Sequence, residues 1–370
     1  MCDWHQPGMV CVYCGRGLLP HAGVAVILGY SCLFPPDASE LALPDAATAR
    51  ALVSARRPEI LAWMQRRRKR LLDYFGANHA AVVDRASDAF LLGLARFGLR
   101  HGTFGDDTHD YHNEGHVLEL ADRRLGAFEH VLGLSALPLS DWLMLSLFAA
   151  CHDLRQREPE DVPGPIGGNE AASIAEALRI LDLCGFDRTR DSARYVELEM
   201  MIAGSTFGMW ARPLSNSAEA AITGGALAPH LPGWLDQAVP DWRRNTAIEH
   251  ALRLARMAAD LDTANAGESF MELADSALRL CREHEMREHR VLDSAASALP
   301  CLAFLSEGQE RFFFELHHFA SREGERVFGP GKAANALRVR AVSAALRAQF
   351  ATVAPADGAE VIDAYRQLAG

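Results

Sequence analysis

The chain has 370 residues, of which 49% are hydrophobic and 23% are charged. This composition is typical of a globular protein with a large core, and it excludes a disordered chain, a fibrous protein and a small disulfide-stabilised peptide. The formal net charge of −11 at pH 7 argues against a nucleic-acid partner, because the phosphate backbone attracts basic surfaces. One basic run, RRRKR at residues 66–70, follows an amphipathic stretch and is expected to form a solvated helix face, with a nucleic-acid or localisation patch as the alternative.

The N-terminal segment, residues 1–45, is irregular and rich in cysteine. Its apolar run, residues 22–34, is shorter than the ~20 residues of a membrane span, and no basic region precedes it as in a secretory signal. We therefore expect a cytoplasmic protein with no membrane partner, in which the eight cysteines are thiols or metal ligands.

Four potential metal ligands lie at the very start of the chain. They form two pairs with two-residue gaps: Cys2 with His5, and Cys11 with Cys14. Such gaps suit a tetrahedral structural zinc ion, although the segment between the pairs is very short. Reduced thiols without metal and a redox pair are the alternatives.

After about residue 45, apolar residues recur every three or four positions, which predicts helices nearly throughout. The predicted helices span residues 46–75, 80–100, 111–132, 140–153, 169–183, 190–204, 245–265, 267–285, 308–323, 332–350 and 357–369. No strand pattern is convincing beyond the N-terminal apolar run, so we expect one all-α domain over residues 46–370. Helices in 46–100 and 332–369 either cover the core or form a homodimer interface.

Two stretches rich in proline and glycine interrupt the helical pattern, at residues 162–168 and 207–241. Long loops inside a compact domain tend to be functional. The second stretch is a candidate lid, with a plain surface loop as the alternative.

Three apolar helices carry side chains that bind metals. His112 and His116 are four residues apart, which on a helix places both on one face. His152 and Asp153 end the second helix, and Asp260 lies near the end of the third. His116, His152, Asp153 and Asp260 together form a ligand set suited to Zn, Mn, Fe or Mg. Taken singly, each residue is more often a satisfied core histidine or a local salt bridge.

These motifs resemble the HD superfamily of metal-dependent phosphohydrolases over roughly residues 108–320. The order H…HD…D is met by His116, His152-Asp153 and Asp260, and residues 111–116, YHNEGH, look like the Y-H-N-x-x-H signature of class I cyclic nucleotide phosphodiesterases. The spacing of 36 positions from His116 to His152 is also similar to theirs.

The resemblance implies an all-helical HD bundle and a specific division of roles. The four ligands would hold Zn, Mn or Fe at a tight site, with Asp153 bridging to a second ion, Mg or Mn. His112 would be the general acid that protonates the leaving ribose oxygen after attack by a metal-activated hydroxide, and Tyr111 and Asn113 would lie at the substrate.

Further along the chain, Gln309 and Phe312 match the Q-x-x-F by which those phosphodiesterases hold a purine. The glutamine amide would bind the base edge and the phenylalanine would stack on it. The alternative is that Phe312 belongs to the apolar core of the helix within FFFELHHF.

The chain departs from the phosphodiesterase pattern after the His-Asp pair. Gln156 stands where HD-x-x-H has its second histidine, and the segment from Asn169 to Ser173 looks more like the N-E-x-x-S-A of small bacterial HD phosphohydrolases. Glu170 in that segment is expected to orient His112 or to accept a hydrogen bond from metal-bound water.

The sequence thus leads to the expectation of an enzyme that hydrolyses a 3′,5′-cyclic nucleotide to the 5′-monophosphate. An HD phosphomonoesterase or nucleotidase is the enzyme alternative. A non-catalytic nucleotide sensor is the second alternative, against which the retention of His112 argues.

Overall fold

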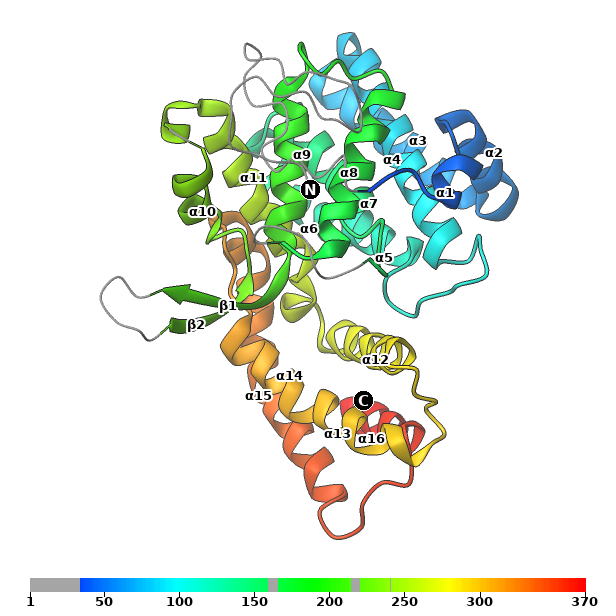
Figure 1. Ribbon diagram of the computed structural model, residues 1–370, viewed down its shortest axis with the longest axis vertical. Helices are drawn as coiled ribbons and strands as arrows, with labels where there is room; N and C mark the ends of the chain where they lie inside the picture. The colour runs from blue at the N-terminus through cyan, green and yellow to red at the C-terminus, as the bar shows by residue number, and fades with distance from the viewer. Residues whose placement is uncertain (1–33, 159–165, 214–219, 240) are drawn as a thin grey trace.

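The computed structural model describes residues 34–158, 166–213, 220–239 and 241–370. These residues are mostly helical and include a single two-stranded sheet, which confirms the all-α class (Figure 1). The predicted zinc ligands of the N-terminal segment, Cys2, His5, Cys11 and Cys14, lie outside the described residues.

The first helices are α1 (Ala38–Ala42), α2 (Ala46–Arg56), α3 (Pro58–Phe75) and α4 (Ala80–His101). The helix predicted over residues 46–75 is therefore two helices. Pro58 occupies the first turn of α3, where its missing N–H costs nothing, and its ring is incompatible with a helix that continues from α2. A capping box between Asp45 and Thr48 starts α2.

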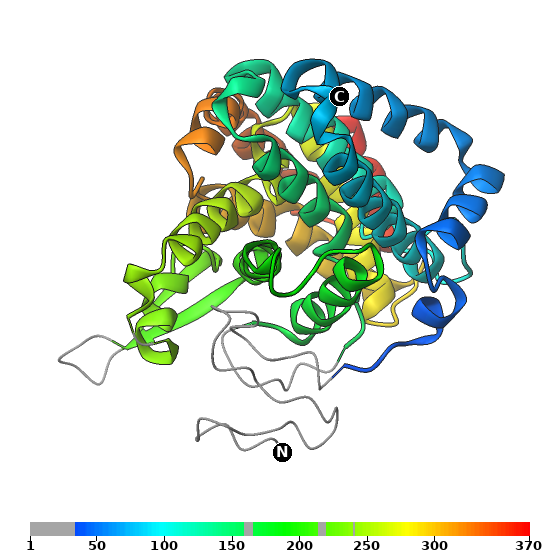
Figure 2. The same ribbon diagram turned by 90° about the horizontal axis from the view of Figure 1, so that it is seen from above.

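The centre of the bundle holds α5 (Glu114–Leu118), α6 (Leu125–Leu132), α7 (Leu139–Cys151), α8 (Gly168–Leu183), α9 (Ser192–Ser205) and α11 (Thr246–Asp262). A π-helical turn, Glu119–Arg124, joins α5 to α6. Nearly every residue of α7 is buried, as expected for a helix that is apolar on all sides. Seen from above, the N-terminal helices coloured blue lie along the outside of this bundle (Figure 2).

The segment predicted as a loop over residues 207–241 contains regular structure. Strands β1 (Phe207–Pro213) and β2 (Ala220–Ala226) form an antiparallel hairpin that projects from the bundle (Figure 1), and α10 (Leu231–Ala238) follows. Gly225 has a φ of 117° and lies against the backbone of Leu316, so both its conformation and its space require glycine.

The C-terminal part contains α12 (Phe270–Arg287), α13 (Ala295–Ala303), α14 (Gln309–Arg311), α15 (Arg322–Gln349) and α16 (Gly358–Ala369). Its apolar side chains form a second buried cluster, separate from the cluster inside the central bundle. The long helix α15 belongs to both, because Phe328 packs in the first cluster while Val339 and Leu346 pack in the second. It connects the two parts of the molecule (Figure 1).

The basic run and the possibility of a membrane-spanning helix both concern the surface of the protein. The basic run lies on α3, where Arg67 and Arg70 pair with Glu129 and Arg68 pairs with Asp84. Most of its charge therefore faces nearby carboxylates rather than forming an open basic patch. Among the described helices, none combines the length and the apolar character needed to cross a membrane.

Candidate metal centre

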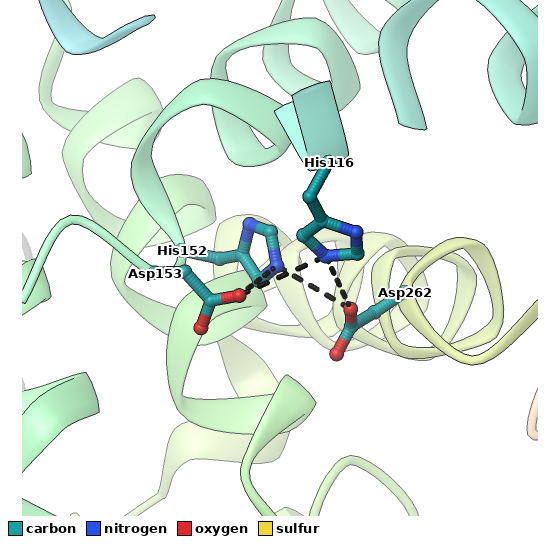
Figure 3. A group of neighbouring side chains, drawn as sticks. All are labelled: His116, His152, Asp153 and Asp262. Carbon is teal, nitrogen blue, oxygen red and sulfur yellow. Dashed lines mark ion pairs between the residues drawn. The ribbon is translucent and has the colours of Figure 1, made fainter. Parts of the chain in front are cut away.

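Four ligand-type side chains from three separate regions of the chain meet in the central bundle (Figure 3). His116 lies on α5, His152 and Asp153 directly follow α7, and Asp262 is the last residue of α11. One donor atom from each lies within 4.8 Å of the other three. The predicted convergence of His116, His152 and Asp153 is thus present.

The distances between donor atoms suit a transition-metal ion. His152 Nε2 lies 2.9 Å from Asp153 Oδ2 and 3.3 Å from Asp262 Oδ1. His116 Nε2 lies 3.4 Å from Asp262 Oδ1 and 3.7 Å from Asp153 Oδ2. Bonds of 2.0–2.1 Å to a tetrahedral zinc ion separate two ligand atoms by about 3.3 Å, so small adjustments bring all four onto one ion.

The two histidines are buried without ordinary hydrogen-bond partners. His116 is 0% exposed and His152 is 2% exposed. Their Nε2 atoms lie near the Asp153 and Asp262 carboxylates, but no contact from a described residue to their ring nitrogens has the geometry of a hydrogen bond. Buried polar atoms that lack partners are costly. A bound metal ion would satisfy the Nε2 atoms of both rings, so the residues present fit a metal centre.

The electrostatics of the cluster favour a cation. Burial lowers the pKa of His152, but Asp153 and Asp262 outweigh burial and raise it well above the usual range. Burial likewise opposes ionisation of Asp153, yet His152 and His112 lower its pKa to about 2. The pKa of Asp262 is lowered too, because His152 and His116 outweigh burial. A divalent ion would take the place of these protons.

The fourth carboxylate belongs to Asp262, and the prediction that it belongs to Asp260 is wrong. The Asp260 carboxylate accepts hydrogen bonds from the backbone N–H groups of Ala320 and Ser321, at 2.6 and 2.8 Å, and from the Ser321 hydroxyl. Gly324 leaves room for it, since a Cβ there would overlap its Oδ2. Asp260 thus holds the start of α15 against α11.

Helix geometry explains this error of two residues. Residues of an α-helix are 100° apart, so Asp260 and Asp262 point about 200° apart around α11. The motif M-A-A-D-L-D contains both aspartates, and its apolar residues do not show which face meets the histidines. Burial raises the pKa of Asp260 to about 7 despite its three hydrogen bonds, which sets it apart from the lowered pKa of Asp262.

His112 lies next to the cluster but outside it. Its Nε2 is 3.7 Å from Asp153 Oδ2, and its Nδ1 is 2.6 Å from Glu283 Oε1. Glu283, on α12, also accepts hydrogen bonds from the backbone N–H groups of Tyr111 and His112, both at 2.9 Å. The carboxylate therefore fixes both the main chain and the ring of His112.

The expectation that His112 and His116 share one helix face is wrong. Helix α5 begins at Glu114, and Asn113 is its N-cap, accepting from the Gly115 N–H at 2.8 Å. His112 precedes the cap and lies in the segment bound by Glu283. No sequence pattern singles out Glu283, because a charged residue on an amphipathic helix normally faces solvent.

Gln156 binds the oxygen of Asp153 that does not contact His152. Its Nε2 donates to Asp153 Oδ1 at 2.9 Å, and its Oε1 accepts from Arg287, which also donates to Glu283. The residue that departs from the phosphodiesterase pattern thus connects the Asp153 and Glu283 carboxylates through one arginine. Such hydrogen bonds hold ligands in orientation for a metal.

Glu170 lies in the first turn of α8, and its carboxyl group feels the charges of the cluster. Burial, with Asp153 and Asp262 nearby, raises its pKa to about 7. The predicted orientation of His112 by Glu170 is therefore wrong, since Glu283 is its partner. The second predicted role of Glu170, accepting from metal-bound water, stays a prediction. In the same segment Ser173 Oγ accepts from the Arg155 N–H at 3.1 Å, which anchors the turn after Asp153.

The side chains predicted to bind substrate are engaged within the protein. Tyr111 is buried, and its ring packs 4.5 Å from the His116 ring between centroids. Asn113 caps α5 and donates to the His109 carbonyl at 2.6 Å. Tyr111 thus packs against a ligand histidine, and Asn113 ties the start of α5 to the main chain at His109.

The residues predicted to hold a purine lie in the C-terminal part. Gln309 begins α14 and is half-buried. The Phe312 ring lies 5.6 Å from that of Phe207 at the start of β1 and 5.5 Å from that of His317. These contacts agree with the alternative that Phe312 packs in an apolar cluster, and they leave the purine-binding role as a prediction.

Comparisons of the chain with protein-family models, with curated proteins and with solved structures gave no match. Any inference about the function of the site therefore depends on the geometry described above.

Proposed function

We propose that the protein is a metal-dependent phosphohydrolase. The observation that carries this proposal is the pairing of a four-ligand cluster, His116, His152, Asp153 and Asp262, with a histidine that is not a ligand. His112 stands 3.7 Å from one ligand carboxylate and is held by Glu283 at its other nitrogen. A site that only stores a metal has no need of a separately oriented histidine.

A divalent ion in this cluster would supply Lewis acidity, which acidifies water and offsets the charge of a phosphate group. The protein's own residues contribute orientation and a proton. Because Glu283 occupies Nδ1 of His112, the ring presents Nε2 toward the cluster. A proton on Nε2 can pass to the leaving oxygen as the P–O bond breaks, which is general-acid catalysis.

The substrate class favoured is a 3′,5′-cyclic nucleotide, opened to its 5′-monophosphate with His112 protonating the ribose 3′ oxygen. Support comes from the resemblance of residues 111–116 to phosphodiesterases and from the Gln309–Phe312 pair. By the HD resemblance, the cluster would hold Zn, Mn or Fe at a tight site, and Asp153 would also serve a second ion, Mg or Mn.

A phosphomonoesterase or nucleotidase is the second candidate, and one observation favours it. Phe312 is already packed against Phe207 and His317, an arrangement that needs no purine. In that case the substrate would present a terminal phosphate to the site, His112 would protonate its leaving oxygen, and Gln309 would have no role in recognition.

The test is product analysis by chromatography after incubation with cyclic AMP, cyclic GMP or 5′-mononucleotides in the presence of Mn²⁺ or Mg²⁺. Asp153→Asn serves as the control that removes a ligand. Formation of a 5′-monophosphate that the control lacks supports the phosphodiesterase. Phosphate release from mononucleotides alone supports the second candidate. Binding of a cyclic nucleotide without turnover would contradict both and indicate a sensor.

A further inference from the structure

We propose a second transition-metal site, formed by His101, Asp107 and His109, at the C-terminal end of α4. One donor atom from each of these residues lies within 4.8 Å of the other two. None of them belongs to the cluster around His116, and none was singled out by the sequence motifs. The proposal does not depend on the catalytic function proposed above.

The backbone brings the two histidines together. His101 is the last residue of α4, and the chain turns back so that the His109 N–H donates to the His101 carbonyl at 2.8 Å. The loop between them is pinned by the Phe104 N–H, which donates to the Gly98 carbonyl, and by Thr103, which binds Glu114. The two imidazole rings lie 4.3 Å apart between centroids.

The donor atoms are spaced for a metal ion. Asp107 Oδ2 lies 3.8 Å from His101 Nδ1 and 3.5 Å from His109 Nε2. Ligand atoms of a tetrahedral zinc ion are about 3.3 Å apart, so a small inward movement of the Asp107 side chain is sufficient. That side chain is 47% exposed, and the partner that would have to give way is the similarly exposed Arg157, which pairs with its Oδ1.

The ring nitrogens of His101 make no hydrogen bond within the described structure. The residue is 3% exposed, and neither ring nitrogen has a hydrogen-bond partner among the described residues. Burying an imidazole in this way destabilises the fold, because both ring nitrogens lose their hydrogen bonds to water. Binding of an ion by Nδ1 would recover part of that cost.

The orientation of His109 is set by a carboxylate. Its Nδ1 lies 3.3 Å from Glu283 Oε1, and the ring is fully buried. A proton on Nδ1 leaves the lone pair on Nε2, the nitrogen that faces Asp107. This is the carboxylate–histidine arrangement that commonly orients metal ligands. Glu283 also binds His112, so it joins this site to the candidate catalytic centre.

One cation already lies close to the site. The Arg157 guanidinium is 2.8 Å from Asp107 Oδ1 and 3.4 Å from His109 Nε2. Its side chain is 51% exposed, so it can move into solvent when an ion enters. Arg157 is therefore a competitor of the ion, and its removal is expected to strengthen binding.

Two imidazoles and one carboxylate select a borderline metal such as Zn²⁺, Co²⁺, Fe²⁺ or Mn²⁺. Three protein ligands leave at least one position to water. Hard ions that prefer all-oxygen surroundings, such as Ca²⁺, are not expected here.

The experiment is a titration of the metal-free full-length chain with Co²⁺, followed by absorption spectroscopy. The Asp153→Asn, Asp262→Asn double variant is the background, because it removes the ligands of the other cluster and makes the result independent of catalysis. Sulfur-to-cobalt charge-transfer bands identify any ion held by cysteines. Apart from any cysteine-bound ion, we expect the double variant to bind one equivalent of Co²⁺ whose spectrum shows nitrogen and oxygen ligands only.

Adding Asp107→Ala to this background should weaken that equivalent about tenfold or more, whereas Asp106→Ala, the neighbouring exposed aspartate, should leave its Kd unchanged. Arg157→Gln should lower the Kd for this Co²⁺ ion several-fold, and His101→Gln should abolish its binding. Equal Kd values for the Asp107 and Asp106 variants, or the absence of the equivalent from the background protein, would overturn the proposal.

Discussion

Glu283 and His112, 171 positions apart in the chain, are joined by two contacts: a 2.6 Å approach at the ring Nδ1 and a 2.9 Å hydrogen bond from the backbone N–H. The carboxylate thereby fixes where the imidazole lies and which of its nitrogens faces Asp153. If His112 is the proton donor, Glu283 is its positioning residue.

Glu283→Gln is expected to lower kcat about 100-fold and to leave the metal content of the four-ligand cluster unchanged, because the amide keeps the size of the side chain but not its charge. Metal analysis beside steady-state kinetics on the active substrate checks this. His112→Ala should lose turnover and also keep the metal. Loss of the metal from either variant would contradict the assignment of His112 as a non-ligand.

Gln156 is expected to tune the affinity for metal. Gln156→Ala removes the hydrogen bond to Asp153 Oδ1 and should weaken binding about 10-fold to 100-fold, the usual effect of losing a group that orients a ligand. Competition with a metal-binding dye measures the affinity. Gln156→Glu, which keeps the size but not the donor, should weaken binding less severely than loss of a ligand; unchanged affinity in both variants would refute the supporting role.

Gln309 separates the two enzyme candidates. For a phosphodiesterase we expect Gln309→Ala to raise KM for a cyclic purine nucleotide at least ~10-fold, since a buried base edge loses its hydrogen-bond partner, while metal content stays constant. Kinetics with cyclic AMP and a cyclic pyrimidine nucleotide measure the effect. A KM that is unaffected for both would leave Gln309 without a role in recognition.

Acid should destabilise the metal-free protein through His317. Burial, with Lys332 and His318 nearby, lowers the pKa of His317 to about 3. The unfolded chain takes up a proton near pH 6.5 and the folded chain does not, so stability is present above pH 6.5 and is lost as the pH falls toward 3.

Between pH 7.5 and 5.5 this histidine alone should remove about 1.4 kcal/mol from the free energy of unfolding. Urea titrations of the wild type and of His317→Gln at both pH values measure this contribution. The variant should lose that much less than the wild type over the same interval; an equal loss in the two proteins would show that His317 titrates normally in the folded state.

Local patterns in the sequence were sufficient for the helices and for three of the four residues of the cluster. Apolar periodicity predicted α4, α7 and α9 closely, and adjacency fixed His152 and Asp153 as one unit. The choice between Asp260 and Asp262 required the packing of α11 against α15, which periodicity on one helix does not contain.

Long-range pairing explains the other misses. Glu283 reaches His112 only because α12 crosses beside the segment before α5, and no local pattern marks that crossing. The hairpin of β1 and β2 escaped prediction because its strands include glycines and proline, which are depleted in strands. Proline and glycine indicated an interruption correctly but not what filled it.

The most direct test of the account is the metal content of two matched variants of the full chain, Asp262→Asn and Asp260→Asn, purified alongside the wild type and reloaded with Zn²⁺ or Mn²⁺. We expect Asp262→Asn to lose the ion of the four-ligand cluster while Asp260→Asn keeps it and is less stable by about 1 kcal/mol, since its hydrogen bonds to the start of α15 are weakened. Full metal content in Asp262→Asn, or loss of metal from Asp260→Asn alone, would contradict the metal centre described here.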